Sequence, residues 1–476
     1  MHHARPAFFF GCLLTASLLA AAAEAAPPNV VVIFADDQGY GDLGCFGSET
    51  IRTPNIDRLA RAGRKFTSFM VASPVCTPSR AALLTGCYPK RVGLHQHVLF
   101  PTSTKGLNPA EHTLADHLKA AGYVTGCFGK WHLGHQPEVL PRAHGFDVYF
   151  GIPYSNDMNH PDNRGQPPGG PAGMDALWAD PGSTLTRWKT PLVENEEIIE
   201  LPVDQRTLTR RYTQRAIGFI REHRGRPFFV YLPHSMPHIP LSVPDDVRDP
   251  NPLHAYTNTI EHLDTEVGRL LDTLDELGLA DTTYVIYTSD NGPWLSFKHH
   301  GGSAGPLRDG KGTTFEGGQR VPCLIRGPGI PAGTVCNGLT GTIDILPTLA
   351  ALTETKLPDN SPIDGLDVSR LWTGQAASSP REEFLHYTSQ GEIEGLRQGS
   401  WKLLVKQPRG GTQPPAGATP RTPQVLLFDL DNDLGEQTNL AAQHPDKVAR
   451  LQTRMADLDR EITANARLPW TSGRDR

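Results

Sequence analysis

The chain has 476 residues, 47 of them glycine and 42 proline, and a formal net charge of −6 at pH 7. This length allows one large domain plus a smaller one, with an ample core. The mild negative charge, with no run rich in Lys or Arg, argues against nucleic acid as a partner.

Residues 1–25 are predicted to be a signal peptide. An apolar run from Phe8 to Ala22 is followed by Ala23-Glu24-Ala25, which is typical of a signal-peptide cleavage site. The run is short for a membrane span, and no other stretch of the sequence is long and apolar enough for one. We therefore expect an exported protein, periplasmic or extracellular, without a membrane span.

Six cysteines follow the predicted signal peptide: Cys45, Cys76, Cys87, Cys127, Cys323 and Cys336. A chain of this size folds around its own core, so these cysteines do not indicate a disulfide framework. A bridge between Cys323 and Cys336 stays open as one possibility in an oxidising compartment.

Residues 29–35 form a run rich in β-branched side chains, the pattern of a strand buried on both faces. The run leads directly into Asp36 and Asp37. Two adjacent carboxylates just beyond a buried strand are costly unless a cation neutralises them. The pair is a candidate metal site, although a solvated turn would show the same two residues.

The stretch from Ser73 to Gly86 contains Cys76 just before a predicted helix. Thr77 is a suitable N-cap, and Pro78 suits the first helical position. Cys76 should then lie at the positive end of the helix dipole, an environment that holds an anion and favours a thiolate. Arg80, one turn further along, adds a forked donor for an oxyanion.

Further strands are predicted at 123–127, 227–232 and 283–288, and each is followed by polar residues. The residues that follow these strands are Lys130 and His132, then His234 in the pattern His-x-x-x-His, then Asp290 and Asn291. Residues 151–200 are rich in Pro, Gly, Asn and Asp, and we expect a long surface loop there that borders a pocket.

Strands and helices alternate along most of the chain, which indicates a parallel sheet with helices on both faces. In such sheets the functional site lies outside the carboxyl ends of the strands. Four sets of polar residues fall just past a predicted strand end, so we expect them to meet in one site. After about residue 355 the chain changes to short strands and one terminal helix, typical of a small antiparallel sheet with a helix packed on it. The predicted division is a catalytic α/β domain at 26–375 and a C-terminal α+β subdomain at 376–476.

The candidate metal ligands offer only oxygen atoms, which suits Ca²⁺ or Mg²⁺ rather than zinc. They are Asp36, Asp37, Asp290 and Asn291. A cation there would surround one tetrahedral anion together with three positively charged side chains. These are Arg80, Lys130 and Lys311, and Lys311 lies in a glycine-rich turn at 310–318. Such a cage stabilises charge that grows on a sulfuryl or phosphoryl oxygen during transfer. His132 and His234 are candidate acid–base groups near neutral pH.

Taken together, these motifs resemble those of the type I sulfatase family. The motifs are Asp-Asp-Gln-Gly from residue 36, Cys-x-Pro-Ser-Arg from 76, Gly-Lys-Trp-His-Leu-Gly from 129, His-x-x-x-His from 234, Ser-Asp-Asn-Gly from 289 and Gly-Lys-Gly-Thr-Thr-x-Glu-Gly-Gly from 310. The resemblance covers nearly the whole chain after residue 29. It implies an alkaline-phosphatase-like α/β fold, with a large mixed, mostly parallel sheet sandwiched by helices and a smaller C-terminal antiparallel sheet plus helix.

The resemblance also implies a nucleophile and a metal. A maturation enzyme would oxidise Cys76 to formylglycine, whose hydrate attacks the sulfur. Ca²⁺, with Mg²⁺ the weaker candidate, would be bound by the four oxygen ligands named above and would contact residue 76.

The same resemblance gives roles to the remaining side chains. Arg80 and His132 would hold and activate the hydrate. Lys130 and Ser155 would grip the sulfate oxygens. Lys311 and His234 would bind the substrate and assist departure of the alcohol.

The expected reaction is hydrolysis of a sulfate ester to an alcohol and sulfate. The expected substrate is a sulfated small molecule or glycan, with a sulfated carbohydrate favoured and an aryl sulfate as a surrogate. Two alternatives stay open: a phosphoester or phosphonate hydrolase of the same superfamily, and a secreted glycan-binding protein without turnover. The intact cysteine motif favours sulfate, and the presence of every expected site residue argues against a non-catalytic protein.

Overall fold

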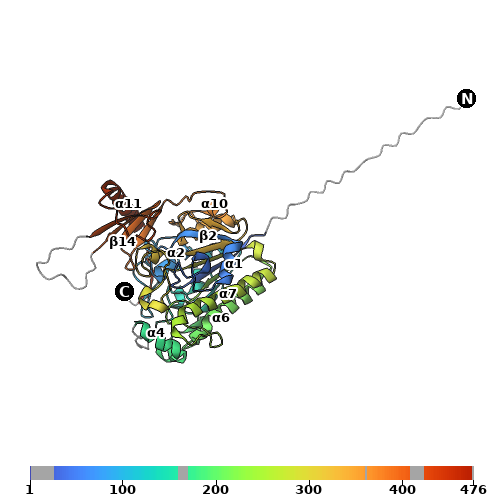
Figure 1. Cartoon of the computed structure of the whole chain (residues 1–476). Helices are drawn as coiled ribbons and strands as arrows, with labels where there is room; N and C mark the ends of the chain where they lie inside the picture. Colours follow the sequence, from blue (N-terminus) through green and yellow to red (C-terminus); the bar gives the residue numbers. More distant parts are fainter. Residues whose placement is uncertain (2–25, 159–169, 360–361, 408–422, 474–476) are drawn as a thin grey trace.

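The computed structural model describes residues 1, 26–158, 170–359, 362–407 and 423–473. Within these residues, one large sheet with helices on both faces forms the body of the protein, and a four-stranded sheet with a long helix lies beside it (Figure 1). Residues 2–25 of the predicted signal peptide lie outside the described residues. Among the described helices, none is long and apolar enough to cross a membrane.

The large sheet contains eleven of the described strands, in the order β11-β2-β10-β9-β1-β8-β4-β5-β6-β7, with β12 also paired to β2. The strands are β1 (Asn29–Ala35), β2 (Arg64–Met70), β4 (Val124–Phe128), β5 (Val148–Gly151), β6 (Leu192–Glu194), β7 (Glu197–Glu200), β8 (Phe228–Pro233), β9 (Thr283–Ser289), β10 (Arg320–Arg326), β11 (Thr334–Cys336) and β12 (Thr340–Gly341). The central strands β9, β1, β8, β4 and β5 are all parallel. β10 is antiparallel to both of its neighbours, so the sheet is mixed. The predicted fold class is confirmed.

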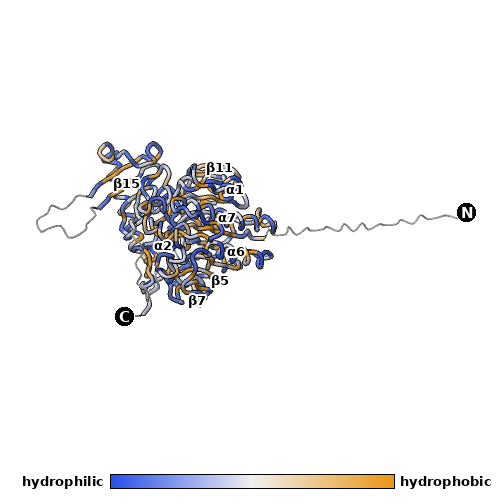
Figure 2. The backbone as a smooth tube through the Cα atoms, turned by 60° about the horizontal axis from the view of Figure 1, so that its bottom comes forward, coloured by the Kyte–Doolittle hydropathy of each residue, from blue (hydrophilic) through white to orange (hydrophobic). Residues whose placement is uncertain are grey.

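Helices cover both faces of this sheet. The elements on one face are α1 (Pro54–Ala62), α6 (Leu208–His223) and α7 (Ala255–Glu276), and those on the other face include α2 (Cys76–Thr85), α3 (Leu114–Ala120) and α9 (Ile345–Leu352). Successive side chains of a strand point to opposite faces. Accordingly, Val31 and Ile33 of β1 pack beneath the first group of helices, whereas Val32 and Phe34 pack beneath the second. Figure 2 shows hydrophobic segments, in orange, throughout this body, interspersed with hydrophilic ones.

The C-terminal sheet anchors a loop of the large body. It is the antiparallel array β13 (Glu383–Tyr387), β14 (Ile393–Gln398), β15 (Trp401–Lys406) and β16 (Gln424–Asp429), and α11 (Pro445–Ala464) packs on it. The buried Lys402 of β15 lies 2.9 Å from both Glu316 and Glu436. Glu316 begins α8 (Glu316–Gln319), which directly follows the loop that carries Lys311. The ionic cluster therefore fixes one end of that loop.

Residues 151–200 contain more regular structure than expected. They include α4 (Gly170–Ala179), α5 (Thr184–Arg187) and the hairpin β6–β7, while residues 159–169 lie outside the described part. Met174, Leu177 and Trp178 of α4 are buried at helical spacing. The surrounding glycines and prolines obscured this pattern in the sequence. The remaining short α-helix and strands among the described residues are β3 (Lys105–Gly106), α10 (Ser369–Trp372) and β17 (Trp470–Thr471), and short 3-10 helices connect several of the elements.

The six described cysteines are all free. Cys323 of β10 and Cys336 of β11 both pair with Phe66 of β2, from opposite sides of that strand. Two strand spacings separate them, roughly 9–10 Å between Cα atoms. A disulfide requires a much shorter separation, so the bridge considered from the sequence does not form.

Candidate active site

The helix α2 begins at Cys76 itself, two residues earlier than predicted. Its N-cap is Val75, which makes no side-chain capping bond. The Thr77 hydroxyl, predicted to cap the helix, instead donates to the carbonyl of His132 and accepts from the N–H of Leu99. Tertiary contacts therefore take the hydroxyl away from the cap. The consequence for Cys76 is the one expected: it lies in the first turn, at the positive end of the dipole.

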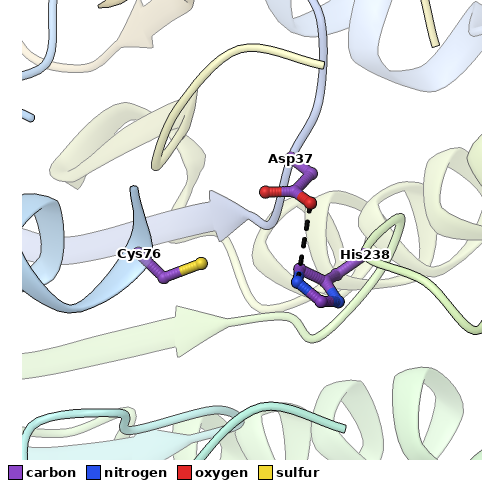
Figure 3. Close-up of side chains that lie close together, drawn as sticks. All are labelled: Asp37, Cys76 and His238. Carbon is purple, nitrogen blue, oxygen red and sulfur yellow. Dashed lines mark ion pairs between the residues drawn. The ribbon is translucent and has the colours of Figure 1, made fainter. Parts of the chain in front are cut away.

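The Cys76 thiol faces the residues that follow β1 and β8. Figure 3 shows its sulfur directed toward Asp37 and His238. The Sγ atom lies 3.5 Å from Oδ1 of Asp36 and 3.6 Å from Nζ of Lys130. Lys311 brings a second ammonium group to 3.8 Å from the same sulfur. The sulfur therefore lies between carboxylates and cations.

Three carboxylates gather around this sulfur. Oxygen atoms of Asp36, Asp37 and Asp290 and the sulfur of Cys76 all lie within 4.8 Å of one another, and all four side chains are buried. Asn291 donates to Asp37 over 2.7 Å, whereas its Oδ1 is buried and has no partner among the described atoms. Buried carboxylates with a spare amide oxygen are the ligands that a hard divalent cation prefers. The predicted oxygen ligands therefore come together, and they fit Ca²⁺ or Mg²⁺.

Three cations balance these carboxylates. Arg80 contacts Asp290 over 2.7 Å and Asp36 over 3.3 Å. Lys130 contacts Asp36 over 2.6 Å, and Lys311 lies 2.8 Å from Asp37. A buried ion pair is tolerated only when its partners neutralise each other, because taking a charge out of water costs several kcal/mol. The equal numbers of opposite charges satisfy this requirement.

Burial and these charges shift the pKa values of the group. Burial opposes ionisation of Asp36, but the cations of Lys130 and Arg80 outweigh it and hold its pKa well below the usual value. Burial raises the pKa of Asp290 to about 7, and the nearby charge of Asp36 adds to the effect. Burial, with the charge of Asp290, also raises the pKa of the Cys76 thiol well above its usual value. The expectation that the helix dipole favours a thiolate is wrong here, because burial outweighs the dipole.

The ring of His132 is held in one tautomer. Its Nε2–H donates to the carbonyl of Leu99 over 2.9 Å, because a carbonyl can only accept. Its Nδ1 is buried and has no partner among the described atoms. Burial, with the charges of Lys130 and Arg80, lowers the pKa of this ring well below its usual value. The result is a neutral imidazole with a free acceptor nitrogen. Its backbone φ of 60° is rare for a non-glycine residue, which indicates a constrained position.

Of the two histidines that follow β8, the structure brings His238 to the site and leaves His234 outside it. His238 Nε2 lies 3.6 Å from Asp37, and its Nδ1–H donates to the carbonyl of Ile239. Neither ring nitrogen of His234 has a described partner, and its ring packs beside Tyr212. Burial lowers the pKa of His234 to about 3. The sequence favoured His234 because this residue directly follows β8. In the structure the His234 ring packs beside Tyr212, and His238, four residues further along the loop, lies beside Asp37.

Ser155 joins the site from the residues after β5. Its hydroxyl lies 3.1 Å from Nζ of Lys130, as expected for two side chains that hold the same anion. With His238 in the place of His234, all the residues predicted from the other motifs are brought together.

The chain is similar to known sulfatases along most of its length. A family model described as Sulfatase matches residues 28–355. Arylsulfatase A of Bos taurus is 41% identical over 424 residues, which cover 86% of this chain and 82% of that protein.

Solved structures share the fold. The PsFucS1 sulfatase from Pseudoalteromonas sp. is 26% identical, with a TM-score of 0.77 and coverage of 94% of this chain and 92% of that one. Ps i-CgsB, solved in complex with k-i-k-neocarrahexaose, is 28% identical, with a TM-score of 0.74 and coverage of 94% and 96%.

Replacing His238 and His234 separately by glutamine tests which ring serves the site. We expect His238→Gln to lower kcat for an aryl sulfate by about 100-fold or more, the usual effect of losing an acid–base group. His234→Gln should lower the unfolding temperature and leave kcat near the wild-type value. Steady-state kinetics and thermal melts of both variants give the answer, and equal losses of kcat would contradict this assignment.

Proposed function

The chain belongs to the sulfatase family and hydrolyses sulfate esters, and we propose that it does so through a formylglycine made from Cys76 beside a bound Ca²⁺. One observation carries the proposal. Cys76 is the first residue of α2, and its sulfur contacts both the carboxylate of Asp36 and the ammonium group of Lys130. The hydrate of formylglycine supplies an oxygen nucleophile at this position, which the thiol itself does not offer.

We propose that Asp36, Asp37, Asp290 and Asn291 hold the Ca²⁺. When bound, the ion supplies positive charge opposite the sulfate oxygens. The four side chains are buried and offer only oxygen atoms, and the unpartnered Oδ1 of Asn291 is a free ligand. Mg²⁺ keeps several waters and demands near-ideal octahedral geometry, so a buried protein cage suits Ca²⁺ better.

The side chains on the α2 side of the site would orient the nucleophile and the sulfate. Arg80 is fixed by Asp290 and by the carbonyl of Lys130, so its guanidinium would hold the hydrate without further ordering. The free Nδ1 of His132 would accept a proton from the hydrate. Lys130 and Ser155, whose polar atoms lie 3.1 Å apart, would bind sulfate oxygens.

The departing alcohol would meet Lys311 and His238. Burial works against a charged Lys311, but the Asp37 carboxylate outweighs it and raises the pKa of the ammonium group. Lys311 therefore keeps a proton to donate to the leaving oxygen. His238, whose Nε2 faces Asp37, takes the role that the sequence resemblance gave to His234.

We propose a sulfated carbohydrate as the natural substrate, with aryl sulfates as surrogates. Support comes from the similar structure of Ps i-CgsB, solved in complex with k-i-k-neocarrahexaose, and from the predicted signal peptide. The protein would act in the periplasm or outside the cell, after a maturation enzyme has converted Cys76.

Substitution of the nucleophile tests the reaction. Cys76→Ala should abolish turnover of an aryl sulfate and retain binding of inorganic sulfate, since the cations of the cage remain. Cys323→Ala, a buried cysteine in β10, is the matched control and should keep turnover. Kinetics and calorimetric titration with sulfate measure both properties. Turnover by Cys76→Ala would rule out the proposed nucleophile.

Removal of the metal tests the cofactor. Dialysis against a calcium chelator should abolish activity and lower the unfolding temperature, because a ligand that binds only the folded state stabilises it. Added Ca²⁺ should restore both at a lower concentration than Mg²⁺. Equal restoration by the two ions would contradict the preference for Ca²⁺.

A further inference from the structure

We propose that Trp294 forms one wall of a subsite for the leaving group, on which a ring of the departing alcohol lies flat. The ligand class is a sulfate ester of an aryl or pyranosyl alcohol. The inference rests on the proposed function, because it takes Lys311 and His238 as the groups nearest the departing oxygen.

Trp294 contacts both of those groups. It follows the metal-ligand segment after β9, separated from Asn291 by Gly292 and Pro293. The Lys311 Nζ atom lies 4.2 Å from the centroid of its ring, and the His238 ring centroid is 5.5 Å away. The indole therefore lies beside the point where the bond to the alcohol would break.

The side of the site that contains Lys311 and Trp294 is the side nearest to solvent. The side chains of Arg80, Lys130 and Asp36 are completely buried, whereas that of Lys311 is 9% exposed. Trp294 itself is only partly buried. An alcohol too large for the cage must therefore extend past Lys311 and along the indole.

The wall is held in place before any substrate binds. Phe297 packs edge-on against Trp294, with ring centroids 4.8 Å apart. The segment then ends at His299 and His300, whose Nε2 atoms lie 2.7 and 2.9 Å from Oδ1 of Asp175 in α4. A fixed wall improves affinity because little side-chain freedom is lost on binding.

The surroundings of Trp294 suit a flat ring with an apolar face. The aromatic ring of Phe297 is partly buried beside it. Ligand sites combine such apolar and aromatic surface with a few polar groups that fix orientation, here Lys311 and His238. Offset contact between two ring faces is favourable beyond the area it buries.

Binding to a protein that does not turn over tests the subsite. Trp294→Ala, Trp294→Phe and the control Leu295→Ala would each be made in the Cys76→Ala protein. Calorimetric titrations would use 4-nitrophenyl sulfate, galactose 6-sulfate and inorganic sulfate. We expect Trp294→Ala to weaken the ring-bearing ligands about tenfold and leave the affinity for inorganic sulfate unchanged. Trp294→Phe should retain most of the affinity, and Leu295→Ala all of it.

The three ligands separate the possible outcomes. A loss confined to the aryl ester identifies an aryl subsite, a loss confined to the sugar ester identifies a pyranosyl subsite, and a loss for both supports a general ring wall. Unchanged affinity for both esters, or an equal loss for inorganic sulfate, would overturn the proposal. Absence of turnover by the unsubstituted protein would count against the proposed function alone, because the binding comparison does not depend on turnover.

Discussion

Mutual neutralisation of buried charges at the carboxyl ends of the central strands is the constraint on which this site depends. Asp36, Asp37 and Asp290 are almost completely buried, and each contacts at least one cation. Removing one partner from such a group leaves an uncompensated charge, at a cost of about 3–5 kcal/mol. With the three cations the charges balance, so a divalent ion added to the set gives a net positive site. A sulfate ester, which is an anion, is the ligand that such a site attracts.

The fold supplies this arrangement from segments far apart in the chain. Parallel pairing of β8, β1 and β9 places their carboxyl ends side by side, which brings Asp36, Asp290 and His238 together. Helix α2 adds Cys76 and Arg80. The C-terminal sheet contributes at a distance, since Lys402 holds Glu316 and with it the end of the Lys311 loop. The site is therefore built on rigid elements, and its more exposed edge is the side of Lys311 and Trp294.

The sequence was most informative where strand ends determine position. A buried strand followed by Asp36 and Asp37 predicts a site because the pairing of β1 in the sheet fixes where its carboxyl end, and so these two side chains, must lie. The path of a loop carries no such constraint. The path of the loop after β8 determines that His238, rather than His234, lies beside Asp37. The hydroxyl of Thr77 likewise finds tertiary partners that no local pattern specifies. The raised pKa of Cys76 follows from its burial. The position of Cys76 at a helix start, read from the sequence, does not indicate how deeply the thiol is buried.

The chemical state of residue 76 tests the central claim most directly. Trypsin cleaves after Lys65 and Arg80, so one peptide, Phe66–Arg80, contains the whole start of α2. Its mass should be measured on active protein purified from its native host. The expected mass is that of the peptide with an aldehyde in place of the CH₂–SH group of Cys76. An unmodified thiol in fully active protein would contradict it.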